Sequence, residues 1–199
     1  MLIPSAQTGL QKALLAIIAA GGVAPAEGAD DSYIIEEIRA VGPGCPPGTF
    51  DFDAEGQHFV YDEMILWHPD PAGRTVQYTN CLTTIAIDVA EGIQVSVAHA
   101  RARGHATLDP GIVARHTMKF FFAGDPSGAM SHTELTGPFD DDYDLSGQLS
   151  PGGEAWSTCG EPVVLGIDSS LQLNASHNPA GTAELSVDRL DMKIQARRC

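Results

Sequence analysis

The sequence predicts an all-β protein, folded as an antiparallel β-sandwich with a jelly-roll-like order of strands. Beyond the first 26 residues, apolar and polar side chains alternate with a period of two over most of the chain. The alternating runs end at Gly, Pro, Asn or Asp, which are the residues that turns favour. This region shows no long run with the period of about 3.6 residues that marks an amphipathic helix. Many short strands separated by turns are typical of sandwiches and jelly rolls.

The expected strands follow directly from the alternating runs, with a hairpin turn at Glu55-Gly56 inside the acidic segment that precedes the second run. They span Tyr33–Ala40, Gln57–Leu66, Arg74–Asp88, Gln94–Leu108, Ile112–Ala123, Ser131–Thr136, Val163–Asn174 and Thr182–Arg198.

Residues 1–26 have the three parts of a cleaved signal peptide. Lys12 precedes an apolar run, Ala13–Ala20, and Val23-Ala24-Pro25-Ala26 forms a small-x-small cleavage pattern. A second cleavage point follows Ala29, and a retained amphipathic N-terminal helix is the alternative. The apolar run is about half of the ~20 residues that a membrane span needs. We therefore predict a secreted, extracellular protein with one β-sandwich domain over residues 27–199 and no membrane span.

The four cysteines, an even number in an exported chain, favour disulfides over metal thiolates. Their long spacings contain no C-x-x-C pair, which argues against a zinc or thioredoxin-like site. Of the three possible pairings we predict Cys45–Cys81 with Cys159–Cys199, which closes two successive loops of similar size. Chain entropy would make each bond worth roughly 4 kcal/mol.

The formal net charge of −15 excludes nucleic acid as a partner, because like charges on the phosphate backbone would repel this surface. The same charge is compatible with high solubility and with divalent cations.

The densest acidic cluster follows Gly137-Pro138, where we expect a loop. Three roles remain open for it: a solvated turn, a site for a hard cation such as calcium, or a catalytic pair of carboxylates. Calcium takes six to eight oxygen ligands from flexible loops, and the candidate metal ligands are Asp140, Asp141, Asp142 and Asp144.

A basic stripe on the expected strand 94–108 is the second candidate site. Its members share one face of the strand, because alternate residues point the same way; they are His99, Arg101, Arg103 and His105. They could bind a carboxylate, sulfate or phosphate, which the arginine fork matches. In so acidic a chain we favour internal pairing, with a neighbouring acidic strand or with the Asp140–Asp144 segment. The small residues of the other face are Ala98, Ala100, Ala102, Gly104 and Ala106.

Several short motifs, taken in order along the chain, resemble a family of secreted proteins from filamentous fungi and bacteria that is catalogued as a domain of unknown function. The motifs are Gly44-Cys45-Pro46-Pro47-Gly48, Asn80-Cys81, Arg103-Gly104 with Ala106, Leu108-Asp109 and Gly111, Phe121-Phe122-Ala123-Gly124, Gly137-Pro138-Phe139-Asp140-Asp141, Trp156-Ser157-Thr158-Cys159-Gly160 and Arg197-Arg198-Cys199. The resemblance implies secretion and a β-rich fold. It implies no established activity and transfers no catalytic residue.

The sequence shows no G-x-S-x-G nucleophile motif, and cysteines that pair are not free to act as nucleophiles. It does contain the N-glycosylation sequon Asn174-Ala175-Ser176, which is used only in a eukaryotic secretory pathway. We predict a non-enzymatic binding or structural module for an extracellular glycan or cell-surface component, with calcium as a candidate cofactor. The alternative is a polysaccharide hydrolase or lyase, which would need two carboxylates about 5–10 Å apart in a cleft, or a His/Arg/Tyr cluster beside an acidic sugar.

Overall fold

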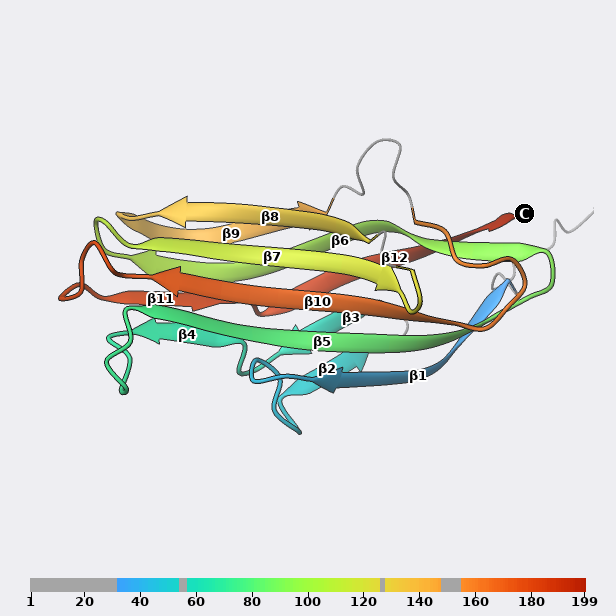
Figure 1. Ribbon diagram of the computed structural model, residues 1–199, viewed down its shortest axis with the longest axis horizontal. Helices are drawn as coiled ribbons and strands as arrows, with labels where there is room; N and C mark the ends of the chain where they lie inside the picture. The colour runs from blue at the N-terminus through green and yellow to red at the C-terminus, as the bar shows by residue number, and fades with distance from the viewer. Residues whose placement is uncertain (1–31, 54–56, 126–127, 148–154) are drawn as a thin grey trace, which may run out of the picture.

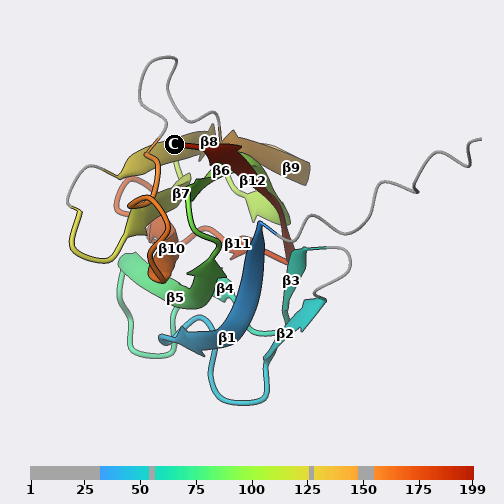
Figure 2. The ribbon, with the colours of Figure 1, turned by 90° about the vertical axis from the view of Figure 1, so that its right-hand side faces the viewer.

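The computed structural model describes residues 32–53, 57–125, 128–147 and 155–199, which form strands and turns without a helix. In this part of the chain no helix is long and apolar enough to cross a membrane. Two antiparallel sheets face each other across one core, as the side and end views show (Figure 1, Figure 2). The predicted β-sandwich is thus confirmed. The expected signal peptide and both cleavage points lie outside the described residues.

The first sheet, called sheet A, has the strand order β1-β5-β10-β7-β8. Its strands are β1 (Tyr33–Val41), β5 (Val76–Val89), β7 (Val113–Phe122), β8 (Ala129–Thr136) and β10 (Val163–Asn174). Sheet B has the order β2-β3-β12-β6-β11-β4, with β9 paired to the other edge of β6. Its strands are β2 (Phe50–Asp53), β3 (His58–Tyr61), β4 (Ile65–His68), β6 (Ile93–Leu108), β9 (Phe139–Gly147), β11 (Ala183–Ser186) and β12 (Arg189–Arg198).

The core lies between the two sheets because every second side chain of each strand points inward. In β5, buried positions alternate with exposed or half-buried ones over all 14 residues. Ile85 and Ile167 of sheet A are fully buried, as are Leu185 and Leu190 of sheet B. Burying such side chains is the main force that holds the sheets together, at about 1.5–3 kcal/mol for each large apolar side chain.

Two of the expected long strands are interrupted, and the two interruptions lie opposite each other. The run 57–66 divides into β3 and β4, and the run 182–198 divides into β11 and β12. At the crossing, the Tyr61 amide donates to the Asp188 carbonyl and the Val187 amide donates to the Met64 carbonyl. As a result β3 pairs with β12, whereas β4 pairs with β11. The expected Glu55-Gly56 turn lies outside the described residues, but β2 and β3 on its two sides do pair as a hairpin.

The strand β6 contains a bulge, so the alternation expected from the sequence is wrong at one of its residues. His99 lies opposite Lys193 and Val97 lies opposite Ile194, so Ala98 is an extra residue without a partner in β12. Ala98 is therefore exposed and does not belong to the small-residue face, whereas Ala100 and Ala102 are buried as expected.

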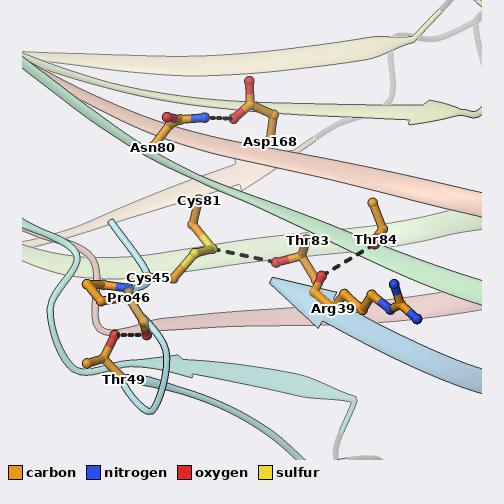
Figure 3. The surroundings of a disulfide bond; sticks show 9 residues. All are labelled: Arg39, Cys45, Pro46, Thr49, Asn80, Cys81, Thr83, Thr84 and Asp168. Carbon is orange, nitrogen blue, oxygen red and sulfur yellow. Dashed lines mark hydrogen bonds between the residues drawn. A yellow bond between two sulfur atoms is a disulfide. The ribbon is translucent and has the colours of Figure 1, made fainter. Parts of the chain in front are cut away.

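Both predicted disulfides are present, in contrasting surroundings. Cys45 and Cys81 lie in the core, where the Cys81 sulfur lies 3.8 Å from the Thr83 hydroxyl (Figure 3). Cys159 and Cys199 are exposed and join the C-terminus to the chain that follows the β9 strand. The bonds link residues 36 and 40 apart, so the two closed loops are of nearly equal length.

This contrast predicts unequal costs for removing the two bonds. In both variants, C45A/C81A and C159A/C199A, losing the cross-link should lower the unfolding free energy by about 4 kcal/mol, because the two loops are of nearly equal length. The total loss should be larger for C45A/C81A, because this variant also leaves a cavity among buried side chains. Urea denaturation of both variants measures the difference. An equal loss in the two variants, or a larger loss for C159A/C199A, would contradict this account.

Candidate ligand-binding site

The predicted acidic cluster and basic stripe lie side by side in sheet B. Residues 139–147 form strand β9, not the expected loop, and β9 pairs with β6 in antiparallel register. Asp144 lies opposite Arg103, and Asp142 lies opposite His105. Opposite charges facing each other across two strands stabilise the pairing, and this explains why a segment rich in aspartate forms a strand here.

The arginines of the stripe are engaged within the protein. Arg101 donates two hydrogen bonds to the Asp144 carboxylate, from Nε at 2.8 Å and from Nη2 at 2.7 Å. These bonds lower the pKa of Asp144 and raise the pKa of Arg101. The Arg103 guanidinium lies 3.7 Å from Asp144 and 3.5 Å from Asp191. The internal pairing that we favoured from the sequence is therefore what the structure contains.

The histidines of the stripe have different surroundings. His105 Nδ1 lies 2.9 Å from Asp142, and its Nε2 lies 3.3 Å from the Thr107 hydroxyl, which donates to Asp140. The hydrogen bond with Asp142 is the main cause that raises the pKa of His105. His99 is exposed at the bulge opposite Lys193, away from these carboxylates.

The four aspartates do not converge on one point. Asp140, Asp142 and Asp144 share the face that meets the basic stripe, whereas Asp141 points to the other side of β9. No group of three or more His, Cys, Asp or Glu side chains among the described residues is placed to hold a metal ion. Calcium at this cluster stays a prediction.

One polar cluster lies inside the core, between the sheets. His116 Nε2 lies 3.0 Å from the Ser169 hydroxyl and Nδ1 lies 3.3 Å from the Tyr143 hydroxyl, which donates to the Ser186 carbonyl at 2.8 Å. Tyr143 has one proton, so Nδ1 of His116 donates and Nε2 accepts from Ser169. Burial lowers the pKa of His116 to about 3 and keeps the ring neutral. This serine–histidine pair resembles a nucleophile with its base, but His116 and Ser169 are each only 1% exposed, so substrate cannot reach them.

A hollow of about 190 Å³ opens on the outer face of sheet A, close to the end of β10. The buried positions of β7 and β10 alternate with outward ones, and the outward ones form the hollow. Its lining residues come from three neighbouring strands and are Val113, Arg115, Glu134, Gln172 and Asn174. Strand pairing places Gln172, Arg115 and Glu134 in one row across the sheet, with Asn174 beside Val113.

The hollow offers hydrogen-bonding groups of both kinds next to an exposed aromatic ring. Arg115 Nη2 donates to Glu134 Oε2 at 2.6 Å, and both side chains are 49% exposed. Tyr78 lies opposite Gln172 on β5 and is 59% exposed. An exposed ion pair contributes only about 0–1 kcal/mol to stability, so the fold does not depend on Arg115 and Glu134.

A second hollow, of about 300 Å³, lies further along the same face of sheet A. Its lining is mostly apolar, and its charged groups are the carboxylates of Glu36 and Asp88. It lacks the mixture of donor and acceptor side chains that the smaller hollow has, so the smaller hollow is the better candidate for a polar ligand.

The sequence did not predict the smaller hollow as a binding site, and of its lining residues only Asn174 was singled out, as part of the glycosylation sequon. Arg115 stands out only as one outward position of the strand 112–123. Its neighbours Glu134 and Gln172 lie far away in sequence and come close to it through the register of three strands. A single sequence carries no signal of that register.

A model of a protein family, described as a domain of unknown function (DUF4360), matches residues 31–199. The chain belongs to this family. The match covers every strand described above and confirms the family resemblance that the short motifs indicate.

The chain is 28% identical over 164 residues to an uncharacterized secreted protein of Arthroderma benhamiae. The match covers 80% of this chain and 66% of that relative, so the chain spans just under two thirds of the relative's length. It confirms the prediction that the protein is secreted. Among solved structures, TmCBM61 in complex with β-1,4-galactotriose aligns with a TM-score of 0.34 and 12% identity, over 81% of this chain and 90% of that chain. So remote a likeness carries no argument about function.

The contacts of His105 predict a pH dependence of the β6–β9 pairing. The pKa of His105 is raised above its ordinary value of 6.5 in the folded state, mainly by the hydrogen bond with Asp142. The contribution of this contact to the stability of the protein is therefore fully present below pH 6.5, and it is lost as the pH rises through the higher pKa of the folded state. In an NMR titration, D142N should bring the pKa of His105 down toward its ordinary value.

The matched control is D141N, which removes the same charge from the next residue, on the other side of β9. It should shift the His105 titration less than D142N does. Equal shifts in the two variants would show that the local hydrogen bond is not the cause.

Proposed function

We propose that the protein is a secreted, non-enzymatic binding module that holds a neutral glycan in the hollow on the outer face of sheet A. The observation that carries this proposal is the convergence of four planar, hydrogen-bonding side chains from three neighbouring strands; they are Arg115, Glu134, Gln172 and Asn174.

The chemistry of the hollow suits hydroxyl groups. A sugar hydroxyl donates one hydrogen bond and accepts others, so it needs acceptors and donors close together. Glu134 supplies an acceptor, Arg115 supplies donors, and the amides of Gln172 and Asn174 supply both. The exposed ring of Tyr78, in the neighbouring strand, provides an apolar surface for the C–H groups of a sugar ring.

The charge of the protein narrows the class of ligand. With a formal net charge of −15, the chain repels anionic polysaccharides at a distance. Within the hollow, the charges of Arg115 and Glu134 balance each other at 2.6 Å. A neutral glycan meets no repulsion and needs no counter-charge.

The same hollow argues for binding rather than hydrolysis. Glycoside hydrolysis requires two carboxyl groups on opposite sides of the scissile bond. Glu134 is the single carboxylate among the described residues that line the hollow, and it is paired with Arg115. We therefore favour the binding module over the polysaccharide hydrolase.

The proposal predicts a specific pattern in a glycan array. The variant R115A should bind about tenfold more weakly, because losing a hydrogen bond from a charged group costs about 1.5 kcal/mol or more. Y78A should also weaken binding by removing the ring beside Gln172. W67A is the matched control, since Trp67 is a 54% exposed aromatic residue on β4 of the other sheet.

Other outcomes of the glycan array would contradict the proposal or change the class of protein. Loss of binding in W67A with intact binding in Y78A and R115A would move the site to sheet B and overturn the proposal. Release of shortened sugars from a bound glycan would establish the hydrolase or lyase. Repeating the array in EDTA tests the sequence prediction of calcium, because signals that survive chelation exclude a role for calcium in binding.

A further inference from the structure

The sequon Asn174-Ala175-Ser176 begins at the last residue of β10, within the lining of the hollow. We propose that Asn174 carries an N-linked glycan when the chain passes through a eukaryotic secretory pathway, and that this glycan covers the hollow. The first part stands on the local geometry of the sequon. The second part rests on the proposed function of the hollow.

The local backbone presents Asn174 in a turn closed by its own side chain. The Ser176 amide donates to Asn174 Oδ1 at 3.0 Å, so the sequon forms an Asx-turn. The contact spans two residues and needs no other part of the fold, so the nascent chain can form it before the sheets assemble. The carboxamide nitrogen Nδ2, to which a glycan would be joined, makes no hydrogen bond with the described residues.

The side chain is also directed away from the core. Leu173 and Ala175, on its two sides, are fully buried, whereas Asn174 is half-buried at the outer face and Ser176 is exposed. Glycosylation at this position would therefore displace no buried side chain. The folded protein can carry the modification without loss of packing.

A glycan on Asn174 would be attached in the lining of the hollow itself. Asn174 lies between Val76 of β5 and Val113 of β7, and the exposed Arg115 and Glu134 follow in the next row. Joined to the protein, the first sugars would have an effective concentration of the order of mM at the hollow. They would compete with any free glycan whose dissociation constant lies near or above this effective concentration, and the fold would not need to change.

The first experiment measures occupancy of the sequon. The full chain is secreted from yeast, and its intact mass is recorded before and after treatment with peptide N-glycosidase F. The chain has one sequon, so any mass that the enzyme removes reports on Asn174. We expect the wild type and S176T to lose the mass of an N-linked glycan, and S176A to show no change.

The second experiment compares binding by the secreted wild type and by S176A on the glycan array. S176A keeps the Asn174 side chain and every residue that lines the hollow, so its binding should exceed that of the glycosylated wild type. N174Q serves in the mass measurement as a second variant without a sequon.

The outcomes separate the two proposals. A secreted wild type with the mass of the unmodified chain overturns the assignment of Asn174. A glycosylated wild type that binds as well as S176A overturns the covering of the hollow. If S176A itself binds no glycan, the proposed function fails, while the mass shift still establishes the modification.

Discussion

The close approach of two backbones at Gly104 is the constraint on which the arrangement of sheet B depends. A Cβ atom at this position would lie 2.0 Å from the Ser186 carbonyl oxygen, so a larger residue would force the strands apart. The chain leaves β11 and enters β12 at this point, and the Asp188 amide donates to the Arg103 carbonyl at 2.9 Å. Glycine thus allows β6 to keep β11 and β12 along one edge while β9 occupies the other edge.

The same point connects the two sheets. The Ser186 carbonyl accepts the Tyr143 hydroxyl of β9, which in turn meets His116 of β7, and His116 meets Ser169 of β10. A slip of one residue in β7 or β10 would turn these polar groups outward and leave their partners unsatisfied in the core. The buried cluster therefore fixes the register of the two strands whose outward residues, Arg115 and Gln172, form the hollow. The buried histidine cluster thus has a structural role, which is to hold in place the strands that carry the proposed binding residues.

Local sequence patterns predicted most of the strands and both disulfides, because alternation and cysteine spacing are properties of the chain itself. The strand β9 was missed because aspartate disfavours strands on its own. What makes residues 139–147 a strand is the row of Arg101, Arg103 and His105 on β6, a partner about 40 residues away. The bulge at Ala98 and the paired breaks between β3 and β4 and between β11 and β12 escape prediction for the same reason. Each depends on which strand lies opposite.

The acidic cluster and the basic stripe, which are the most conspicuous charges of the sequence, pair with each other inside sheet B. In the part of the chain that the structure describes, β9 pairs with β6 and with no second strand of sheet B, so its other edge has no ladder and resembles the edge strands that proteins must protect from pairing with another chain. The carboxylates of Asp140, Asp142 and Asp144 protect such an edge, because they repel a second copy of this chain, whose net charge is also −15. The same carboxylates face the basic stripe of β6. Because these charges pair with each other, they are not available to a ligand, and the glycan binding that we propose relies on weaker polar groups elsewhere. The hollow on sheet A, with its amides, the balanced pair of Arg115 and Glu134 and the exposed ring of Tyr78 nearby, offers such groups to the proposed glycan.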